Sequence, residues 1–472
     1  MSEDLCEYDF AVIGGGSAGY AAARTAVGHG LKTVVIDGAD PLGGLCILRG
    51  CMPSKTLIES ANRNLTIRRA AEFGLQAEQG TADIMAVRDR KRRLIADFAG
   101  YRQGQLSDGR FTLLRGTAAF IDEFSLRVSL REGGEQIVKF RTACVATGSV
   151  VNVPPMPGLL ETGFWTSDDI LDAAELPSSF IVLGGGAIAL EMAHYLDGIG
   201  RKVTVVQRRD RLLGTMDQEC GAAVAKAFRE RGIEVFCGTA VRRVEHVEGG
   251  KQVTFDHHGA PVSLMAAEIL VATGRTPRID GLGLDLAGIA IQGHKIEISK
   301  EMQTTRPHIF AAGDVCSPLD IVHIAIQQGE AAAHNAAAIL RREKPAVSVD
   351  YRLTLFGVFC EPQAAMAGAT EEQLHRDGVP FATASYPFDD HGKSMVMGET
   401  EGFVKLIAHR ETGEILGASV VGPHATEIIH EVVVAMQFHC TVKQFMLIPH
   451  YHPTLSEIWT YPAEELADEL DL

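Results

Sequence analysis

The chain has 472 residues, enough for more than one domain, and 46% of them are hydrophobic, which suffices for a large core. Its formal charge of −16 argues against a nucleic-acid partner, and its apolar runs are too short or too often interrupted to span a bilayer. The acidic start is unlike a secretory leader, so we expect a cytoplasmic protein with neither a membrane nor nucleic acid among its partners.

The first predicted elements form a strand–helix–strand unit at residues 8–38. Gly14 and Gly16 make a tight turn that brings backbone N–H groups to a pyrophosphate at the start of the helix. Gly19 lets this helix pack closely on the sheet. Asp37 ends the second strand, where a carboxylate accepts hydrogen bonds from a ribose hydroxyl. The unit therefore predicts a dinucleotide site.

Two cysteines follow in the stretch GGLCILRGCMPSK, residues 43–55. Cys46 and Cys51 are open to three interpretations. A metal site needs further ligands, and no second Cys/His pair at a matching spacing accompanies these two. A structural disulfide is disfavoured by the reducing conditions of the cytosol. A redox-active pair is the third interpretation, and the geometry allows it.

The glycines of this stretch would let the two thiols approach each other. In a regular helix, residues five apart rise by about 7.5 Å, which is too far for a disulfide. Gly43, Gly44 and Gly50 can supply the loop or distortion that is needed, with Cys51 opening a helix. The dipole of a helix stabilises a thiolate at its N-terminus, and Lys55 adds a positive charge one turn later.

A second strand–helix–strand unit at residues 179–209 repeats the first and predicts a second dinucleotide site. Its fingerprint positions are Gly184, Gly186 and Ala189. Gln207 stands where the first unit has its carboxylate, and Arg208 and Arg209 follow it. A guanidinium binds the 2′-phosphate of NADP, which a carboxylate would repel. This unit therefore favours NADP(H), unless the arginines merely end an exposed strand.

Three further apolar strands end in turn motifs. They lie at residues 144–149, 270–275 and 308–315. The first two contain Ala-Thr-Gly, and the third runs into Gly313 and Asp314. The proline-rich segment 151–159 between the two units reads as a domain boundary. After residue 352 the pattern changes to that of an α+β domain.

Near the end, residues 448–459 (IPHYHPTLSEIW) hold a candidate acid–base pair. Thiol–disulfide exchange needs a proton donor for the leaving thiolate, and imidazole suits this task because it titrates near neutral pH. His452 precedes Pro453, which can start a helix, and Glu457 lies one turn later, where it could orient the imidazole. By itself this segment could also be an H-x-H pair at a surface turn, but the cysteine pair elsewhere in the chain favours the catalytic interpretation.

In chain order, these motifs resemble those of the pyridine nucleotide–disulfide oxidoreductases, FAD flavoproteins that include dihydrolipoamide dehydrogenase, glutathione reductase and mercuric reductase. The resemblance covers essentially the whole chain. It rests on the cysteine stretch, both glycine fingerprints, both Ala-Thr-Gly motifs, IFAAGD and HPTLSE. It implies an α/β fold with two Rossmann-like dinucleotide-binding domains, for FAD and for NAD(P), and a C-terminal α+β dimerisation domain. The expected segments are residues 1–150 for the first part of the FAD-binding domain, 151–275 for the NAD(P)-binding domain, 276–345 for the return of the FAD-binding (central) domain, and 346–472 for the dimerisation domain.

The resemblance also implies roles for single residues. FAD would bind the first fingerprint, Asp37 and Asp314. Cys51 would face the flavin as the charge-transfer thiolate, and Cys46 would attack the substrate. No resident metal is expected. The other residues expected to contact the two cofactors are Gly44, Thr147, Gly148, Gly313 and Gly274.

Two further pairs follow from the resemblance. Lys55 and Glu191 resemble the ion pair that the family places beside the flavin N5. His452 and Glu457 resemble the acid–base dyad, which in this family comes from the partner subunit. We therefore expect an obligate homodimer with the C-terminal domain at its interface.

Differences from individual family members narrow the reaction. The tail has no cysteine pair and His452 is present, which disfavours metal-ion reduction. Ala189 and Arg208 resemble the NADPH site of glutathione reductases, although Gly214 stands where those enzymes have a second phosphate-binding arginine. We expect NADPH, with NADH as the alternative coenzyme, to pass hydride to FAD. The electrons then reach the cysteine pair and finally a small-molecule or protein disulfide. The alternatives are a dihydrolipoamide dehydrogenase that oxidises a dithiol with NAD, and a flavin reductase for a quinone, a metal ion or oxygen.

Overall fold

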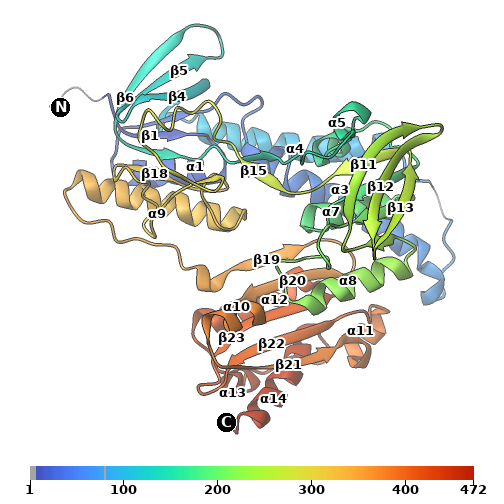
Figure 1. Ribbon diagram of the computed structural model, residues 1–472. Helices are drawn as coiled ribbons and strands as arrows, with labels where there is room; N and C mark the ends of the chain where they lie inside the picture. The colour runs from blue at the N-terminus through green and yellow to red at the C-terminus, as the bar shows by residue number, and fades with distance from the viewer. Residues whose placement is uncertain (1–6, 79–80, 472) are drawn as a thin grey trace. The chain divides into compact units, whose positions relative to one another are not determined.

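The computed structural model describes residues 7–78 and 81–471 (Figure 1). The chain divides into two units, each assembled from three separate segments. Both units contain parallel strands linked through helices, which confirms the predicted α/β class. The domain limits stay predictions; residues 54–88, expected in the FAD-binding part, group with unit 2. Unit 1 comprises Met1–Pro53, Asp89–Asn152 and Arg275–Val349, and unit 2 comprises Ser54–Arg88, Val153–Gly274 and Asp350–Leu472.

The core of unit 1 is a seven-stranded sheet with the order β3-β2-β1-β6-β5-β4, in which β18 also pairs with β6. Strands β1, β2, β3, β6 and β18 run parallel, while β4, β5 and β6 form an antiparallel meander. Strands β1, β2 and β18 are almost wholly apolar and buried, as expected where a sheet is covered by other elements. The strands are β1 (Tyr8–Ile13), β2 (Thr33–Ile36), β3 (Thr112–Leu114), β4 (Gly116–Asp122), β5 (Ser125–Leu130), β6 (Glu135–Val145) and β18 (Ile309–Ala311), with the small ladders β7 (Ser149–Val151) with β15 (Arg275–Pro277) and β16 (Ile291–Gln292) with β17 (Lys295–Ile296).

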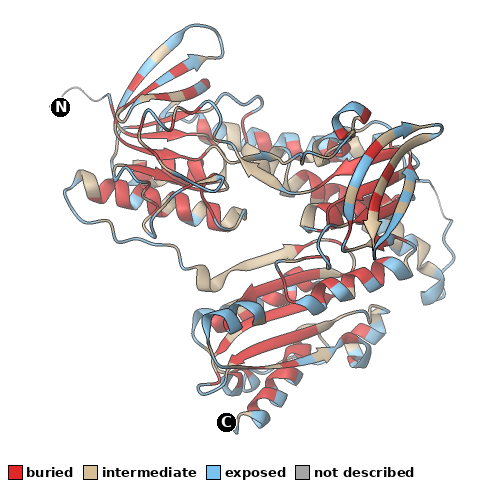
Figure 2. Ribbon diagram, viewed as in Figure 1, coloured by how far each residue is buried: buried red, intermediate tan, exposed pale blue. Residues whose placement is uncertain are grey.

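Two helices of small residues, α1 (Ser17–Gly28) and α9 (Val322–Leu340), lie side by side in unit 1 (Figure 1). Their facing sides are buried (Figure 2). A Cβ added at Gly329 would lie 2.2 Å from the carbonyl oxygen of Ala18, so only glycine permits this close approach. The other helices that begin or end in unit 1 are α2 (Gly44–Leu48), α3 (Cys51–Arg68) and α4 (Ile84–Leu106).

Unit 2 contains a four-stranded parallel sheet with the order β10-β9-β8-β14 and a three-stranded antiparallel sheet, β11-β12-β13. Helix α7 packs on the parallel sheet and is buried along most of its length. The strands are β8 (Ser179–Leu183), β9 (Lys202–Val206), β10 (Glu234–Phe236), β11 (Ala240–Val247), β12 (Gly250–His257), β13 (Ala260–Ala266) and β14 (Glu268–Val271). The helices are η2 (Ala70–Phe73), α5 (Leu159–Thr162), α6 (Ser167–Asp172), α7 (Ala187–Gly198) and α8 (Gln218–Glu230).

The C-terminal part of unit 2 is a five-stranded antiparallel sheet with the order β19-β20-β23-β22-β21. Helix α12 packs on β20 and β23, and α14 packs on β21 and β22. The fully buried Trp459 donates its indole N–H to the carbonyl of Ile428 (3.1 Å), which ties the segment around Glu457 to α12. The strands are β19 (Leu355–Val358), β20 (Gln363–Gly368), β21 (Phe381–Pro387), β22 (Phe403–His409) and β23 (Ile415–Gly422). The helices are η3 (Tyr351–Leu353), α10 (Glu371–Asp377), η4 (Phe388–Asp390), α11 (Gly392–Met397), α12 (Ala425–Gln437), α13 (Val442–Met446), η5 (Ser456–Trp459) and α14 (Thr460–Glu469).

The internal repeat extends to atomic contacts. Gly14 (φ +103°) and Gly184 (φ +130°) occupy backbone conformations that favour glycine. A Cβ at Gly14 would lie 2.4 Å from the carbonyl oxygen of Ala146, and one at Gly184 would lie 2.3 Å from that of Ala272. Each alanine begins an Ala-Thr-Gly motif, so in both units this motif borders the fingerprint turn.

Candidate functional site

The first fingerprint turn and the cysteine stretch are in direct contact within unit 1. A Cβ at Gly44 (φ +75°) would lie 2.6 Å from the Cα of Gly16. Gly16 is also the N-cap of α1 and has no side chain to occupy the first amides of the helix. The missing side chains leave a cradle at a helix N-terminus, and a diphosphate fits such a cradle. The residues at this turn are therefore compatible with FAD.

The two cysteines lie on consecutive helices. Cys46 is in the five-residue helix α2, and Cys51 begins α3; both are half-buried. A Cβ at Gly50 would lie 3.1 Å from the Cα of Cys46, so the chain folds back tightly at this glycine. The expected distortion is thus a break between two helices, so the two cysteines are not held at the spacing of a single regular helix. Lys55 stands one turn after Cys51 in α3.

The predicted ribose-binding carboxylate is fixed at the end of β2. Asp37 accepts hydrogen bonds from the backbone N–H of Gly15 to Oδ2 and of Ala39 to Oδ1, both at 2.8 Å. These amides hold the carboxylate beside the fingerprint turn. The remaining lone pairs of its two oxygens can accept hydrogen bonds from ribose hydroxyls.

The motif after β18 meets the first Ala-Thr-Gly motif. Asp314 accepts a hydrogen bond from the Ser149 hydroxyl (2.6 Å), and Gly313 (φ +79°) donates its N–H to Gln328 (2.8 Å). Thr147 donates its hydroxyl to the carbonyl of Arg278 (2.7 Å). Gly148 (φ +70°) accepts from the Arg278 amide (2.9 Å) through its own carbonyl oxygen.

The second fingerprint differs in its last position and in the residue that ends the strand. A Cβ at Gly19 would lie 1.8 Å from the carbonyl oxygen of Gly14, whereas the second unit accommodates the methyl group of Ala189. The side chain of Gln207 fills the corner beside the turn: a Cβ at Gly185 would lie 2.9 Å from its Cδ. Gly186 has open space where a Cβ would lie, and Gly274 (φ +110°) follows β14.

The three polar residues after β9 have different surroundings. Gln207 donates its amide to the carbonyl of Arg211 (3.3 Å), and Arg209 donates to that of Gly214 (3.4 Å). Arg208 is exposed, and its guanidinium makes no hydrogen bond or ion pair with the described residues. Arg208 is therefore the guanidinium available to an incoming phosphate.

Lys55 and Glu191 meet within unit 2. Nζ of Lys55 lies 2.8 and 2.7 Å from the two carboxylate oxygens of Glu191, whose side chain is 5% exposed. The backbone N–H of Phe359 donates to Oε1 (3.2 Å), and the Phe359 ring lies 4.6 Å from the same Nζ. A buried carboxylate is thus satisfied by one ammonium and one amide.

The acid–base candidates also form a pair within unit 2. Nδ1 of His452 lies 2.9 Å from Oε2 and 3.2 Å from Oε1 of Glu457. The imidazole is 78% exposed, whereas the Glu457 side chain is only 11% exposed. The carboxylate orients the ring, and because Nδ1 faces Glu457, Nε2 is directed elsewhere and is available for proton transfer.

Sequence reasoning missed two residues beside these pairs. Phe359 contributes its backbone N–H, a group that every residue except proline has, so the identity of its side chain gave no signal. His391 is fully buried, and its Nε2 lies 3.4 Å from Oε1 of Glu457. It belongs to no motif, and the only available signal was a histidine next to a glycine in a polar turn.

Neither a membrane span nor a metal cluster is found in the part of the chain that the structure describes. No helix there is both long and apolar enough to cross a bilayer, and no group of three or more His, Cys, Asp and Glu side chains could hold a metal ion.

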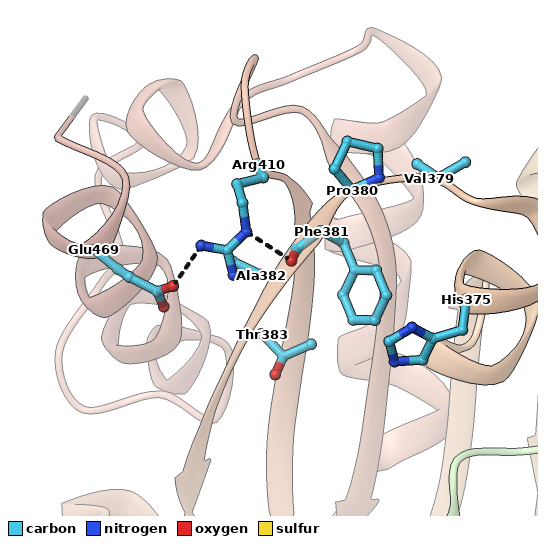
Figure 3. A pocket seen from close by; sticks show the side chains of 8 residues that line it. All are labelled: His375, Val379, Pro380, Phe381, Ala382, Thr383, Arg410 and Glu469. Carbon is cyan, nitrogen blue, oxygen red and sulfur yellow. Dashed lines mark hydrogen bonds and ion pairs between the residues drawn. The ribbon is translucent and has the colours of Figure 1, made fainter.

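A pocket of ≈ 420 Å³ lies beside β21 (Figure 3). There Arg410 donates to the carbonyl of Phe381 (3.2 Å) and pairs with Glu469 (3.4 Å). It contains none of the predicted site residues, and its cation is already paired, so we assign it no role in the reaction.

Comparison with known proteins gives two family matches that together cover most of the chain. Residues 8–329 match the model described as pyridine nucleotide-disulphide oxidoreductase. Residues 356–463 match the dimerisation domain of the same group.

Curated relatives span almost the whole chain. A dihydrolipoyl dehydrogenase from Geobacillus stearothermophilus is 32% identical over 460 residues, covering 97% of this chain and 96% of the relative. One from Mycobacterium leprae is 33% identical over 458 residues, covering 96% and 97%.

Solved structures agree with these matches. LpdA from Mycobacterium tuberculosis has a TM-score of 0.85 at 28% identity, covering 97% of this chain and 99% of its own. The Cu(II) complex of RclA from Escherichia coli, an HOCl-induced flavoprotein disulfide reductase, has a TM-score of 0.84 at 27% identity, covering 98% of this chain and 100% of its own.

Proposed function

Because the chain belongs to the pyridine nucleotide-disulphide oxidoreductase family and is an FAD-dependent enzyme acting on disulfides, we propose that it is a homodimeric, NADPH-dependent disulfide reductase. The observation that carries this proposal is the contact of Gly44 with Gly16, which joins the cysteine stretch to the cradle of the first nucleotide site. A redox pair beside a nucleotide turn is suited to accept electrons from a cofactor bound there.

In the proposed reaction, bound FAD supplies the two-electron carrier between the nicotinamide and the Cys46–Cys51 disulfide. The thiolate of Cys46 then attacks one sulfur of the substrate RSSR; a mixed disulfide forms and RS⁻ leaves. His452 of the second subunit protonates this thiolate. The thiolate of Cys51 attacks Cys46, re-forms the internal disulfide and expels a second RS⁻, which takes up the remaining proton as the second thiol. The sum is NADPH + H⁺ + RSSR → NADP⁺ + 2 RSH.

The remaining pairs hold groups in place. Glu191 fixes the ammonium of Lys55, which, as in the family that the chain belongs to, would serve beside the flavin. Glu457 orients the imidazole of His452. Asp37 and the glycines of the first turn would bind the ribose and diphosphate of FAD.

Replacing Arg208 by alanine is expected to raise KM for NADPH by about 10- to 100-fold, because a charge-assisted contact to phosphate contributes about 1.5–3 kcal/mol. KM for NADH should change far less, since NADH has no 2′-phosphate. Steady-state kinetics with both coenzymes provide the measurement. Arg211→Ala is the matched control, because Arg211 lies three residues after Arg208 and its guanidinium is already paired with Glu372. An equal loss with both coenzymes would refute the assignment of NADPH.

The direct test of the proposed function is anaerobic titration with NADPH and with NADH while the visible spectrum is recorded. Purified protein should contain flavin, and NADPH should produce a long-wavelength charge-transfer band faster than NADH does. Disulfides, including lipoamide and oxidised glutathione, are then added to reoxidise the enzyme. Protein without flavin, or reduced flavin that no disulfide reoxidises, would contradict the proposal.

The second candidate is a dihydrolipoamide dehydrogenase that oxidises a dithiol with NAD. It is favoured by the curated relatives from Geobacillus stearothermophilus and Mycobacterium leprae, which are dihydrolipoyl dehydrogenases and match this chain over almost their full length. The two candidates use the same cysteines and differ in direction and coenzyme. Faster flavin reduction by dihydrolipoamide than by NADPH, together with NAD-dependent reoxidation, would select the second.

A further inference from the structure

A second histidine lies beside the Glu457 carboxylate that pairs with His452. His391 is 0% exposed, and its Nε2 is 3.4 Å from Oε1 of Glu457, while Nδ1 of His452 is 2.9 Å from Oε2. The oxygen nearest to His452 is Oε2, but its Nδ1 also lies 3.2 Å from Oε1, the oxygen that His391 faces. Nε2 of His391 makes no hydrogen bond within the described chain, so its 3.4 Å approach to Oε1 is an electrostatic contact, weaker than that of His452.

The orientation of His391 is fixed by a third group. Its Nδ1 lies 2.9 Å from the hydroxyl of Ser394, which is also fully buried. A hydroxyl can donate to Nδ1 of a neutral imidazole, which leaves the proton on Nε2, the atom that faces Glu457. The four side chains then form a continuous series of polar contacts, from Ser394 through His391 and Glu457 to His452.

Burial keeps His391 in the state that this chain requires. Burial lowers the pKa of His391, and the attraction of Glu457 opposes this effect only in part, so the ring is neutral near pH 7. The charge of His452 also acts to lower it, and the backbone of Thr454 acts to raise it. Tyr461 is the other titratable side chain near the ring, at 6.4 Å between centroids. The carboxylate of Asp390 is engaged with the hydroxyl of Tyr386 (2.8 Å).

An ordinary helix cap does not account for this arrangement. His391 precedes α11, but its side chain makes no capping hydrogen bond to the backbone of that helix. Its ring contacts a side-chain hydroxyl on one side and a carboxylate on the other. The Glu457 side chain is almost buried, and its other partner, His452, is 78% exposed. His391 is thus the buried partner of this carboxylate, and a buried carboxylate needs donors.

We propose, resting on the function proposed above, that His391 is a positioning residue of the acid–base pair. The positive edge of its Nε2–H attracts Oε1 of Glu457, which limits rotation of the carboxylate and so keeps Oε2 aligned with Nδ1 of His452. Ser394 sets the proton position on His391. His391 acts through Glu457 and does not itself touch the substrate.

The test compares the wild type with His391→Leu, which removes the donor, and His391→Gln, whose amide can reach the position of Nε2 without titrating. Diethyl pyrocarbonate modifies neutral imidazoles, and peptide mass spectrometry reads its pH-dependent reaction at His452 alone. With the Leu variant we expect the pH midpoint to fall by about 0.5 unit, because a carboxylate that is free to turn stabilises the imidazolium less. Turnover of the disulfide should fall about tenfold. The Gln variant should restore both within a factor of two.

The outcomes are separable. An unchanged midpoint overturns the inference, and a raised one shows that His391 competes with His452 for the carboxylate, which also overturns it. Failure of Gln to restore the Leu loss would indicate a packing role alone. If the Leu variant does not fold, Ser394→Ala replaces it, and an unchanged midpoint there decides against the inference. Because the modification needs no substrate, a wild type without disulfide turnover would refute the proposed function while the midpoint still decides the role of His391.

Discussion

Replacing Cys46 by serine is expected to abolish disulfide turnover, with a loss of about 10³-fold or more, while NADPH still reduces the flavin. The hydroxyl of serine is not ionised at neutral pH and cannot form the mixed disulfide. Stopped-flow absorbance measures the two half-reactions separately. The loss should appear only in the step that follows addition of the disulfide.

Cys440 provides a matched control for this substitution. It is also half-buried, but burial raises the pKa of its thiol, so it is a poor nucleophile at neutral pH. Cys440→Ser should therefore retain the full rate. Retention of physiological turnover by Cys46→Ser would point instead to a flavin reductase for a non-disulfide acceptor.

The cysteine stretch shows how far local sequence reasoning extends. Glycine positions and the five-residue spacing indicated a break before Cys51, because these are properties of neighbouring residues. The five-residue helix α2 was not foreseen, since it is too short to show a helical period. The contact of Gly44 with Gly16 depends on the tertiary fold, and no local pattern contains it.

The nucleotide turns show a similar limit. The repeat predicted the strand–turn–helix geometry of both units, and the structure has it in both. The sequence could not separate Arg208 from Arg209, which look equivalent in a strand-end pattern. Both are exposed, but Arg209 donates to the carbonyl of Gly214, the position where the resembling enzymes have a second arginine, and this leaves Arg208 as the one of the two whose guanidinium makes no hydrogen bond within the described chain.

His391 was missed for a different reason. Its partner Glu457 lies far along the chain, and the two come together only because η5 and the turn before α11 meet on the C-terminal sheet. The resemblance supplied Lys55 with Glu191 and His452 with Glu457 as pairs, but it contained no third member. Residues that position a catalytic carboxylate have no fixed sequence separation from it, so they are found only from the three-dimensional structure.

Replacing His452 by glutamine is expected to slow the disulfide half-reaction by about 10²- to 10⁴-fold, because the leaving thiolate loses its proton donor. Reduction of the flavin by NADPH should be nearly unchanged, since that step releases no thiolate of the substrate. Rapid-mixing experiments with NADPH and with the disulfide, each under anaerobic conditions, measure the two rates.

The neighbouring histidine of the H-x-H pair provides the control. His450 is nearly buried, and its Nε2 is engaged with Glu431 (2.5 Å) while Nδ1 faces the carbonyl of Ile448 (2.8 Å). Both ring nitrogens are occupied, so His450→Gln should leave the disulfide half-reaction at its normal rate. If His452→Gln slows both half-reactions alike, the proton-donor role is wrong, and the His452–Glu457 pair serves the dimer interface instead. If His450→Gln causes the larger loss, the surface-turn interpretation of the segment applies, and the proton must come from another group.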